Sequence, residues 1–106
     1  MTTLSTHVLD SVRGLPASAM TGVLIGQDGA ELEISATDAA GRIRFDTPLV
    51  AGAYGLYFDT GPWFAAAGRE TIYPAVTISF SVDAGRDHLH VPLLLSPFSY
   101  TTYRGS

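Results

Sequence analysis

The chain has 106 residues, of which 46% are hydrophobic and 15% are charged, and its formal net charge is −4. This length fits one folded domain, and the low charge argues against an intrinsically disordered chain. All six basic residues are scattered arginines and cysteine is absent, which argues against a nucleic-acid-binding surface and excludes both a disulfide framework and a thiolate metal site.

The first half of the chain alternates between apolar and polar residues with the period of two that is typical of β-strands. Strands are predicted over residues 4–10, 21–27 and 31–36, with a short one after Arg42. Asp28-Gly29, between the second and third strands, predicts a tight hairpin because Asp-Gly tolerates positive φ angles. In the third strand Leu32 and Ile34 alternate with glutamates, which predicts one buried face and one solvated face.

The second half of the chain contains one helix candidate among further strands. Strands are predicted over residues 53–58, 76–83, 88–95 and 100–104. Residues 62–68 begin with proline, contain three alanines and end with glycine, which predicts a helix of about two turns. Seven or eight short strands with one small helix indicate an all-β fold, an antiparallel β-sandwich formed by residues 1–106 as a single domain.

The strand predicted at residues 88–95 includes an apolar run, residues 91–95, that would be buried on both of its faces. Such a run fits a central strand of the core, or a strand whose outer face is covered by another subunit. Pro92 has no amide hydrogen and is disfavoured within a central ladder. We therefore favour an edge or bulged strand at a subunit interface.

Three histidines, His7, His88 and His90, are the main candidates for chemistry. His88 and His90 are two residues apart on a predicted strand, so their side chains point to the same face. They could ligate zinc, with His7 completing a three-histidine site, or serve in acid–base catalysis near neutral pH. They could equally be polar surface residues, and their types and spacing leave all three interpretations open.

Two arginines are candidates for binding an oxygen-rich ligand. Arg42 follows a turn and, taken alone, is typical of a solvated charge. Arg104 lies near the end of the chain, but residues 100–103 before it are rich in β-forming types, which predicts a docked strand. An arginine held there would present a fixed fork of five donors. The chain has no Gly-x-Ser-x-Gly elbow, phosphate loop or acidic constellation, which excludes most other familiar enzyme classes.

No stretch of the chain approaches the roughly 20 apolar residues that a membrane-spanning helix needs. Residues 1–7 contain neither the positive charge nor the apolar run of a secretory signal, and residues 104–106 do not match a peroxisomal address. We therefore expect a soluble, cytoplasmic protein.

Four motifs resemble those of the 5-hydroxyisourate hydrolases of the transthyretin-like family. They are His7-Val8-Leu9-Asp10 with the following Gly14-Leu15-Pro16-Ala17, the central Gly41-Arg42, the run from His88 to Phe98, and the terminal Tyr103-Arg104-Gly105-Ser106. The similarity extends from about residue 4 to the last residue, and the two terminal motifs are the most specific. The chain departs from the family at Leu15, where a basic residue is common, and at Leu89, which replaces a usual tyrosine.

The resemblance implies a hydrolase of urate catabolism that opens 5-hydroxyisourate at its N1–C6 amide, giving 2-oxo-4-hydroxy-4-carboxy-5-ureidoimidazoline without metal or cofactor. It implies a homotetramer, a dimer of dimers with sites at the dimer–dimer interface. It also implies one pocket, in which the catalytic residues are His7, Arg42 and His90, and the substrate-binding residues are Tyr103, Arg104, Gly105 and Ser106.

We expect His7 and His90 to share the proton transfers of this reaction, with either ring as the base, and Arg42 to stabilise the oxyanion or bind ring oxygens of the substrate. The alternatives are a non-enzymatic small-molecule carrier with the same fold and a three-histidine zinc hydrolase.

Overall fold

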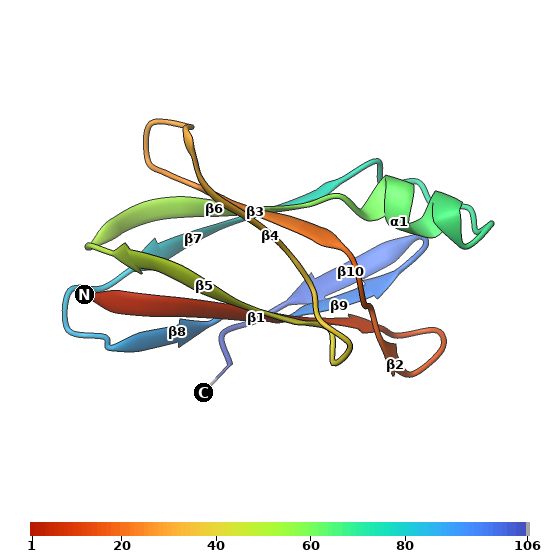
Figure 1. The fold of residues 1–106 in the computed structure, drawn as a ribbon, viewed down its shortest axis with the longest axis horizontal. Helices are drawn as coiled ribbons and strands as arrows, with labels where there is room; N and C mark the ends of the chain where they lie inside the picture. The colour runs from red at the N-terminus through yellow and green to blue at the C-terminus, as the bar shows by residue number, and fades with distance from the viewer. Residues whose placement is uncertain (106) are drawn as a thin grey trace.

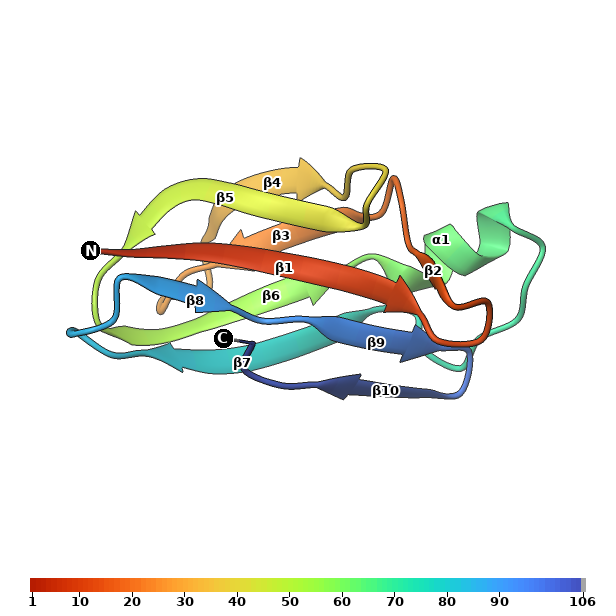
Figure 2. The same ribbon diagram turned by 90° about the horizontal axis from the view of Figure 1, so that it is seen from below.

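A computed structural model of the chain, which describes residues 1–105, contains two β-sheets packed face to face and a short helix at one end (Figures 1 and 2). This arrangement confirms the predicted all-β sandwich. The elements, in chain order, are β1 (Thr2–Asp10), β2 (Leu15–Pro16), β3 (Thr21–Ile25), β4 (Glu31–Ala36), β5 (Arg42–Leu49), β6 (Gly52–Phe58), α1 (Thr60–Ala66), β7 (Val76–Val82), β8 (His88–His90), β9 (Leu93–Ser96) and β10 (Ser99–Thr102).

The first sheet is built around β1, which has strands along both of its edges (Figure 2). Strands β2 and β5 pair with β1 antiparallel, β8 and β9 pair with it parallel, and β10 pairs antiparallel with β9. The second sheet is antiparallel throughout, in the order β4-β3-β6-β7. The described residues form ten strands, more than the seven or eight predicted, because β2 has only two residues and the strand expected at 88–95 is divided.

Strand β1 alternates strictly between the core and the outside. Its even-numbered residues, among them Leu4, Thr6 and Val8, are buried, whereas Ser5 and His7 are only half-buried. The inward side chains pack on large apolar groups such as those of β6 and α1, which form one continuous core between the sheets. Burying one Leu or Phe side chain fully stabilises the folded state by about 1.5–3 kcal/mol. The core therefore fixes the odd-numbered residues of β1 on the outer face of the first sheet.

The predicted burial of β4 is wrong, although the strand itself is confirmed. Leu32 and Ile34 are 42% and 62% exposed, and Glu33 between them faces the neighbouring β5. The carboxylate of Glu33 accepts hydrogen bonds from the backbone N–H groups of Asp46 and Thr47 at 2.8–3.1 Å. These amides lie on an edge strand and need a partner. Glu33 therefore lies on the more buried face of β4, and Leu32 and Ile34, which the alternation predicts to be buried, lie on the exposed face.

Of the two arrangements predicted for the strand around Pro92, the edge strand is wrong, whereas an irregularity at the proline is present. Strands β8 and β9 stop on either side of Val91 and Pro92, and β9 lies between β1 and β10, in the interior of the sheet. Proline cannot donate to a neighbouring strand, so the ladder is interrupted where it stands. The carbonyl of Pro92 instead accepts a hydrogen bond from Thr102 Oγ1 at 2.8 Å.

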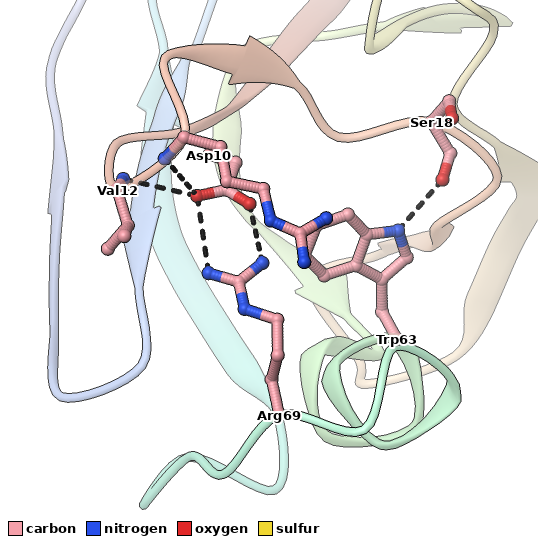
Figure 3. Close-up of polar contacts among 6 residues, drawn as sticks. Asp10, Val12, Ser18, Trp63 and Arg69 are labelled. Atoms are coloured by element: carbon pink, nitrogen blue, oxygen red, sulfur yellow. Dashed lines mark hydrogen bonds and ion pairs between the residues drawn. The ribbon is translucent and has the colours of Figure 1, made fainter.

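Helix α1 is shifted by two residues from its predicted position at 62–68, and it is not long or apolar enough to cross a membrane. Figure 3 shows how the segment around it is anchored to the end of β1 and to the loop between β2 and β3. Trp63 Nε1 donates to the Ser18 carbonyl at 2.8 Å, and Arg69 forms an ion pair with the buried Asp10 at 2.6 Å. Burial raises the pKa of Asp10, but hydrogen bonds from Arg69 and from backbone amides outweigh it and leave the pKa lowered. The pair fixes the end of the strand that carries His7.

Candidate active site

Three predicted site residues meet on the outer face of the first sheet. Arg42, the first residue of β5, lies directly opposite His7 in the register with β1. His90 of β8 lies opposite Ser5, which is two residues before His7 and therefore on the same face of β1. Because β5, β1 and β8 run side by side (Figure 2), the structure brings His7, Arg42 and His90 together from three neighbouring strands.

The surroundings of His90 favour the neutral form of its ring. Burial lowers its pKa from the ordinary value of 6.5, and electrostatic interaction with His7, His88 and Arg42 lowers it further. Both causes disfavour the protonated ring, which would be poorly solvated and would repel the neighbouring charges. His90 is therefore available as a proton acceptor at neutral pH.

A chain of hydrogen bonds ends at the ring of His90. Ser5 Oγ lies 2.7 Å from His90 Nδ1 and 2.9 Å from His88 Nε2, and Thr3 Oγ1 lies 2.6 Å from His88 Nδ1. Thr3 and Ser5 are outward-facing residues of β1, directly opposite His88 and His90 of β8. Sequence reasoning left His88 out of the site and overlooked both hydroxyls. The alternation of β1, which places Thr3, Ser5 and His7 on one face, was the signal available for finding them.

The tail is docked beside His90, as predicted, although the regular strand ends at Thr102 and not at 104. Strand β10 pairs with β9 over its whole length. Beyond it, the backbone N–H of Gly105 donates to the carbonyl of His90 at 2.8 Å. A Cβ atom on residue 105 would lie 2.6 Å from His90 Cδ2. Only glycine fits this contact without a shift of the ring or the tail.

The remaining tail residues occupy different surroundings. Tyr103 and Arg104 are exposed and line a hollow of about 200 Å³ beside β7, together with the edge residues Ile78 and Phe80. Within residues 1–105, no hydrogen bond joins Tyr103 or Arg104 to the three clustered side chains. The structure therefore brings Gly105, but not these two side chains, into contact with the cluster, and Ser106 lies outside the described residues.

The cluster differs in its geometry from a metal centre. Among residues 1–105, no three His, Asp or Glu side chains are grouped so that they could hold a metal ion. The histidines are instead linked through hydroxyl groups, with Ser5 Oγ standing between His88 and His90. The cluster places proton donors and acceptors beside a permanent positive charge, which suits acid–base chemistry at a polarised carbonyl.

The fold and the outward cluster together define a transthyretin-like β-sandwich with a polar site on one sheet. The family of the chain follows directly: residues 4–105 match the model of the HIUase/Transthyretin family, to which this chain belongs. It is 41% identical to the 5-hydroxyisourate hydrolase of Mus musculus over 97% of this chain and 94% of that protein.

Two solved structures agree with this assignment. The 5-hydroxyisourate hydrolase of Klebsiella pneumoniae is 45% identical and superposes with a TM-score of 0.91, covering 100% of this chain and 94% of that one. Sea bream transthyretin, solved in complex with thyroxine, is 31% identical with a TM-score of 0.86, covering 96% and 93%. The chain thus resembles both branches of the family in fold, and the hydrolase from Klebsiella more strongly in sequence.

Proposed function

We propose that the chain is an enzyme of urate catabolism that hydrolyses 5-hydroxyisourate, and that residues 1–106 carry this activity as one domain. Its strongest support in the molecule is the meeting of His7, Arg42 and His90 on one sheet face, where His90 is held neutral. The likeness over nearly the full chain to proteins named 5-hydroxyisourate hydrolase supports the substrate.

The proposed reaction is attack of water on the C6 carbonyl of the cyclic amide. His90 takes a proton from the water as its oxygen bonds to C6, and assistance of this kind is worth about 10²- to 10⁴-fold in rate. Arg42 stabilises the negative charge that develops on the carbonyl oxygen. The C6–N1 bond then breaks as N1 takes a proton from His7, and the proton that His90 took from water returns to His7, so that both rings are restored. The product is 2-oxo-4-hydroxy-4-carboxy-5-ureidoimidazoline, and no metal or cofactor takes part.

The tail is proposed to bind the substrate. The backbone N–H of Gly105 donates to the carbonyl of His90, which ties the tail to the strand that carries the proposed base. The guanidinium of Arg104 can bind ring oxygens of the substrate with two parallel donors. Tyr103 and Ser106 complete the proposed binding set.

We further propose a cytoplasmic homotetramer, a dimer of dimers whose sites lie at the dimer–dimer interface. The outer face that carries the cluster also carries Leu9 and Leu94, which are register partners and only half-buried. Covering this face with a second copy would bury those leucines and exclude bulk water from the imidazoles. Exclusion of water strengthens every electrostatic interaction in a site. The mass of the protein in solution, measured by light scattering, tests the tetramer.

The activity is tested with freshly prepared 5-hydroxyisourate, whose decay is followed by its near-ultraviolet absorbance. The purified chain should accelerate the decay far above the spontaneous rate at catalytic concentrations and release the ring-opened carboxylate. The alternative is a carrier with the same fold, as the complex of sea bream transthyretin with thyroxine suggests. A carrier would bind 5-hydroxyisourate stoichiometrically and leave the rate of its decay unchanged. That result would contradict the proposal.

A further inference from the structure

Donor and acceptor roles along the hydrogen-bond chain that ends at His90 can be worked out from its far end. The Thr3 hydroxyl has one proton and lies 3.4 Å from the carbonyl of Asp87, which can only accept. We take this proton to be directed at the carbonyl, in which case Thr3 Oγ1 accepts from Nδ1 of His88 at 2.6 Å. The proton of a neutral His88 ring is therefore on Nδ1, and its Nε2 carries a lone pair.

The same reasoning continues to His90. The lone pair on His88 Nε2 accepts the proton of Ser5 Oγ at 2.9 Å. Ser5 Oγ has no second proton to give, so at 2.7 Å it accepts from Nδ1 of His90. A neutral His90 thus has its proton on Nδ1 and an unprotonated Nε2.

We propose that Ser5 and His88 are positioning residues that hold neutral His90 in the tautomer with its proton on Nδ1, so that Nε2 is the atom that accepts a proton. The catalytic meaning of this inference rests on the proposed hydrolysis. The tautomer itself does not, because it can be measured in the free protein. The two residues act through His90 and need not touch the substrate.

Removal of the Ser5 hydroxyl and removal of the His88 ring should affect the tautomer of His90 differently. Removing the Ser5 hydroxyl leaves Nδ1 of His90 without this partner, so the preference between tautomers weakens. Removing the His88 ring frees the Ser5 proton, which can then turn toward Nδ1 of His90. That turn favours a proton on Nε2 and blocks the accepting atom. Loss of His88 should therefore be the more harmful change while Ser5 is present.

Long-range ¹H–¹⁵N correlation spectra of protein labelled at its histidines test the inference. They are recorded at about pH 8, above the ordinary imidazole pKa of about 6.5, and the signals are assigned by comparison with His90→Ala. The wild type should show His90 protonated on Nδ1. Ser5→Ala should show mixed tautomers and His88→Ala a shift toward Nε2–H. Ser5→Thr, which keeps a hydroxyl on a strand, should restore the wild-type pattern, and Ser35→Ala, a half-buried serine of β4, should leave it unchanged.

Turnover of 5-hydroxyisourate provides the second readout. Ser5→Ala should lower kcat about 2- to 10-fold with little change in KM. This factor corresponds to the net free energy of one hydrogen bond. His88→Ala should lower kcat further, and the Ser5→Ala/His88→Ala double variant should be no worse than His88→Ala alone. A purely structural role for the pair would instead give losses that add.

Two results would overturn the proposal: a wild-type His90 that carries its proton on Nε2, or a Ser5→Ala protein whose Nδ1–H tautomer stays fully populated. Neither result bears on whether the chain hydrolyses 5-hydroxyisourate. Conversely, a protein that shows the expected tautomer but no turnover would refute the proposed function and leave the assigned hydrogen-bond roles intact.

Discussion

Replacing Gly105 by alanine would add a methyl group that has no room beside His90. The new Cβ would lie 2.6 Å from Cδ2, 3.2 Å from Cγ and 3.3 Å from Cβ of the histidine. Carbon atoms in contact prefer about 3.5–4.0 Å, so the ring or the tail must move by about 1 Å. The tail can move only by stretching the hydrogen bond from the Gly105 amide to the His90 carbonyl.

The cost of this crowding sets the expected loss of activity. Overpacking of this kind costs about 1–3 kcal/mol. If this energy disfavours the arrangement in which the tail is docked and the ring is correctly placed, kcat/KM falls about 5- to 150-fold. Global stability should change by less than about 0.5 kcal/mol, because the strain is relieved at the end of the chain.

The assay compares Gly105→Ala with Gly85→Ala, a glycine whose added Cβ would meet nothing within 4 Å. Decay of 5-hydroxyisourate gives kcat/KM, and urea unfolding gives the stability of each variant. The control should retain wild-type activity. Wild-type kcat/KM in Gly105→Ala would refute the idea that the tail must pack against His90 for turnover.

Three further changes have defined outcomes. Arg42→Met should lower kcat about 10²- to 10³-fold through loss of oxyanion stabilisation; because a positive charge that lowers the pKa of His90 is also removed, the acid limb of the kcat/KM profile should move to higher pH. Asp10→Asn should destabilise the fold by about 3–5 kcal/mol in urea, because it leaves Arg69 without its buried partner, whereas Asp83→Asn, at an exposed residue, should be neutral within about 0.5 kcal/mol. Prolonged dialysis against EDTA should leave turnover unchanged, and loss of activity that zinc restores would contradict the metal-free mechanism.

The sign of the Asp10 effect can be checked separately against pH. Its folded pKa is lowered, so the stability it contributes is present above the ordinary carboxyl pKa of 3.8 and is lost as pH falls through the folded value. The difference in unfolding free energy between wild type and Asp10→Asn should therefore be largest near neutral pH and shrink in acid. A difference that grows as the pH falls would contradict the ion pair.

Most strands could be predicted from the sequence because their signal is local. Alternation in residues 76–82 places every second side chain in the core, and the structure bears this out. Strand β4 has an equally clear alternation, but its side was predicted wrongly. The reason is that Glu33 satisfies edge amides of β5, a contact that depends on how two distant strands are placed.

The features of the site likewise fall into those with a local sequence signal and those without one. That His88 and His90 share a face follows from their spacing alone, and the docked tail follows from its β-forming residues. The hydroxyls of Thr3 and Ser5 became part of the site only through the parallel register of β1 with β8, which joins residues more than 80 positions apart and has no local signature. Pro92 has a local signal, its missing amide, which predicts an edge or a bulged strand; the strand is broken there but lies in the interior of the sheet.

The rates at which His7→Ala and His90→Ala open the ring of 5-hydroxyisourate test the proposed site most directly, with Ser35→Ala, at a half-buried residue of the other sheet, as the control. Each histidine variant should lose about 10²- to 10⁴-fold in kcat while unfolding at the same urea concentration as the wild type. Wild-type turnover in both variants would show that the imidazoles brought together on this sheet do not carry the chemistry.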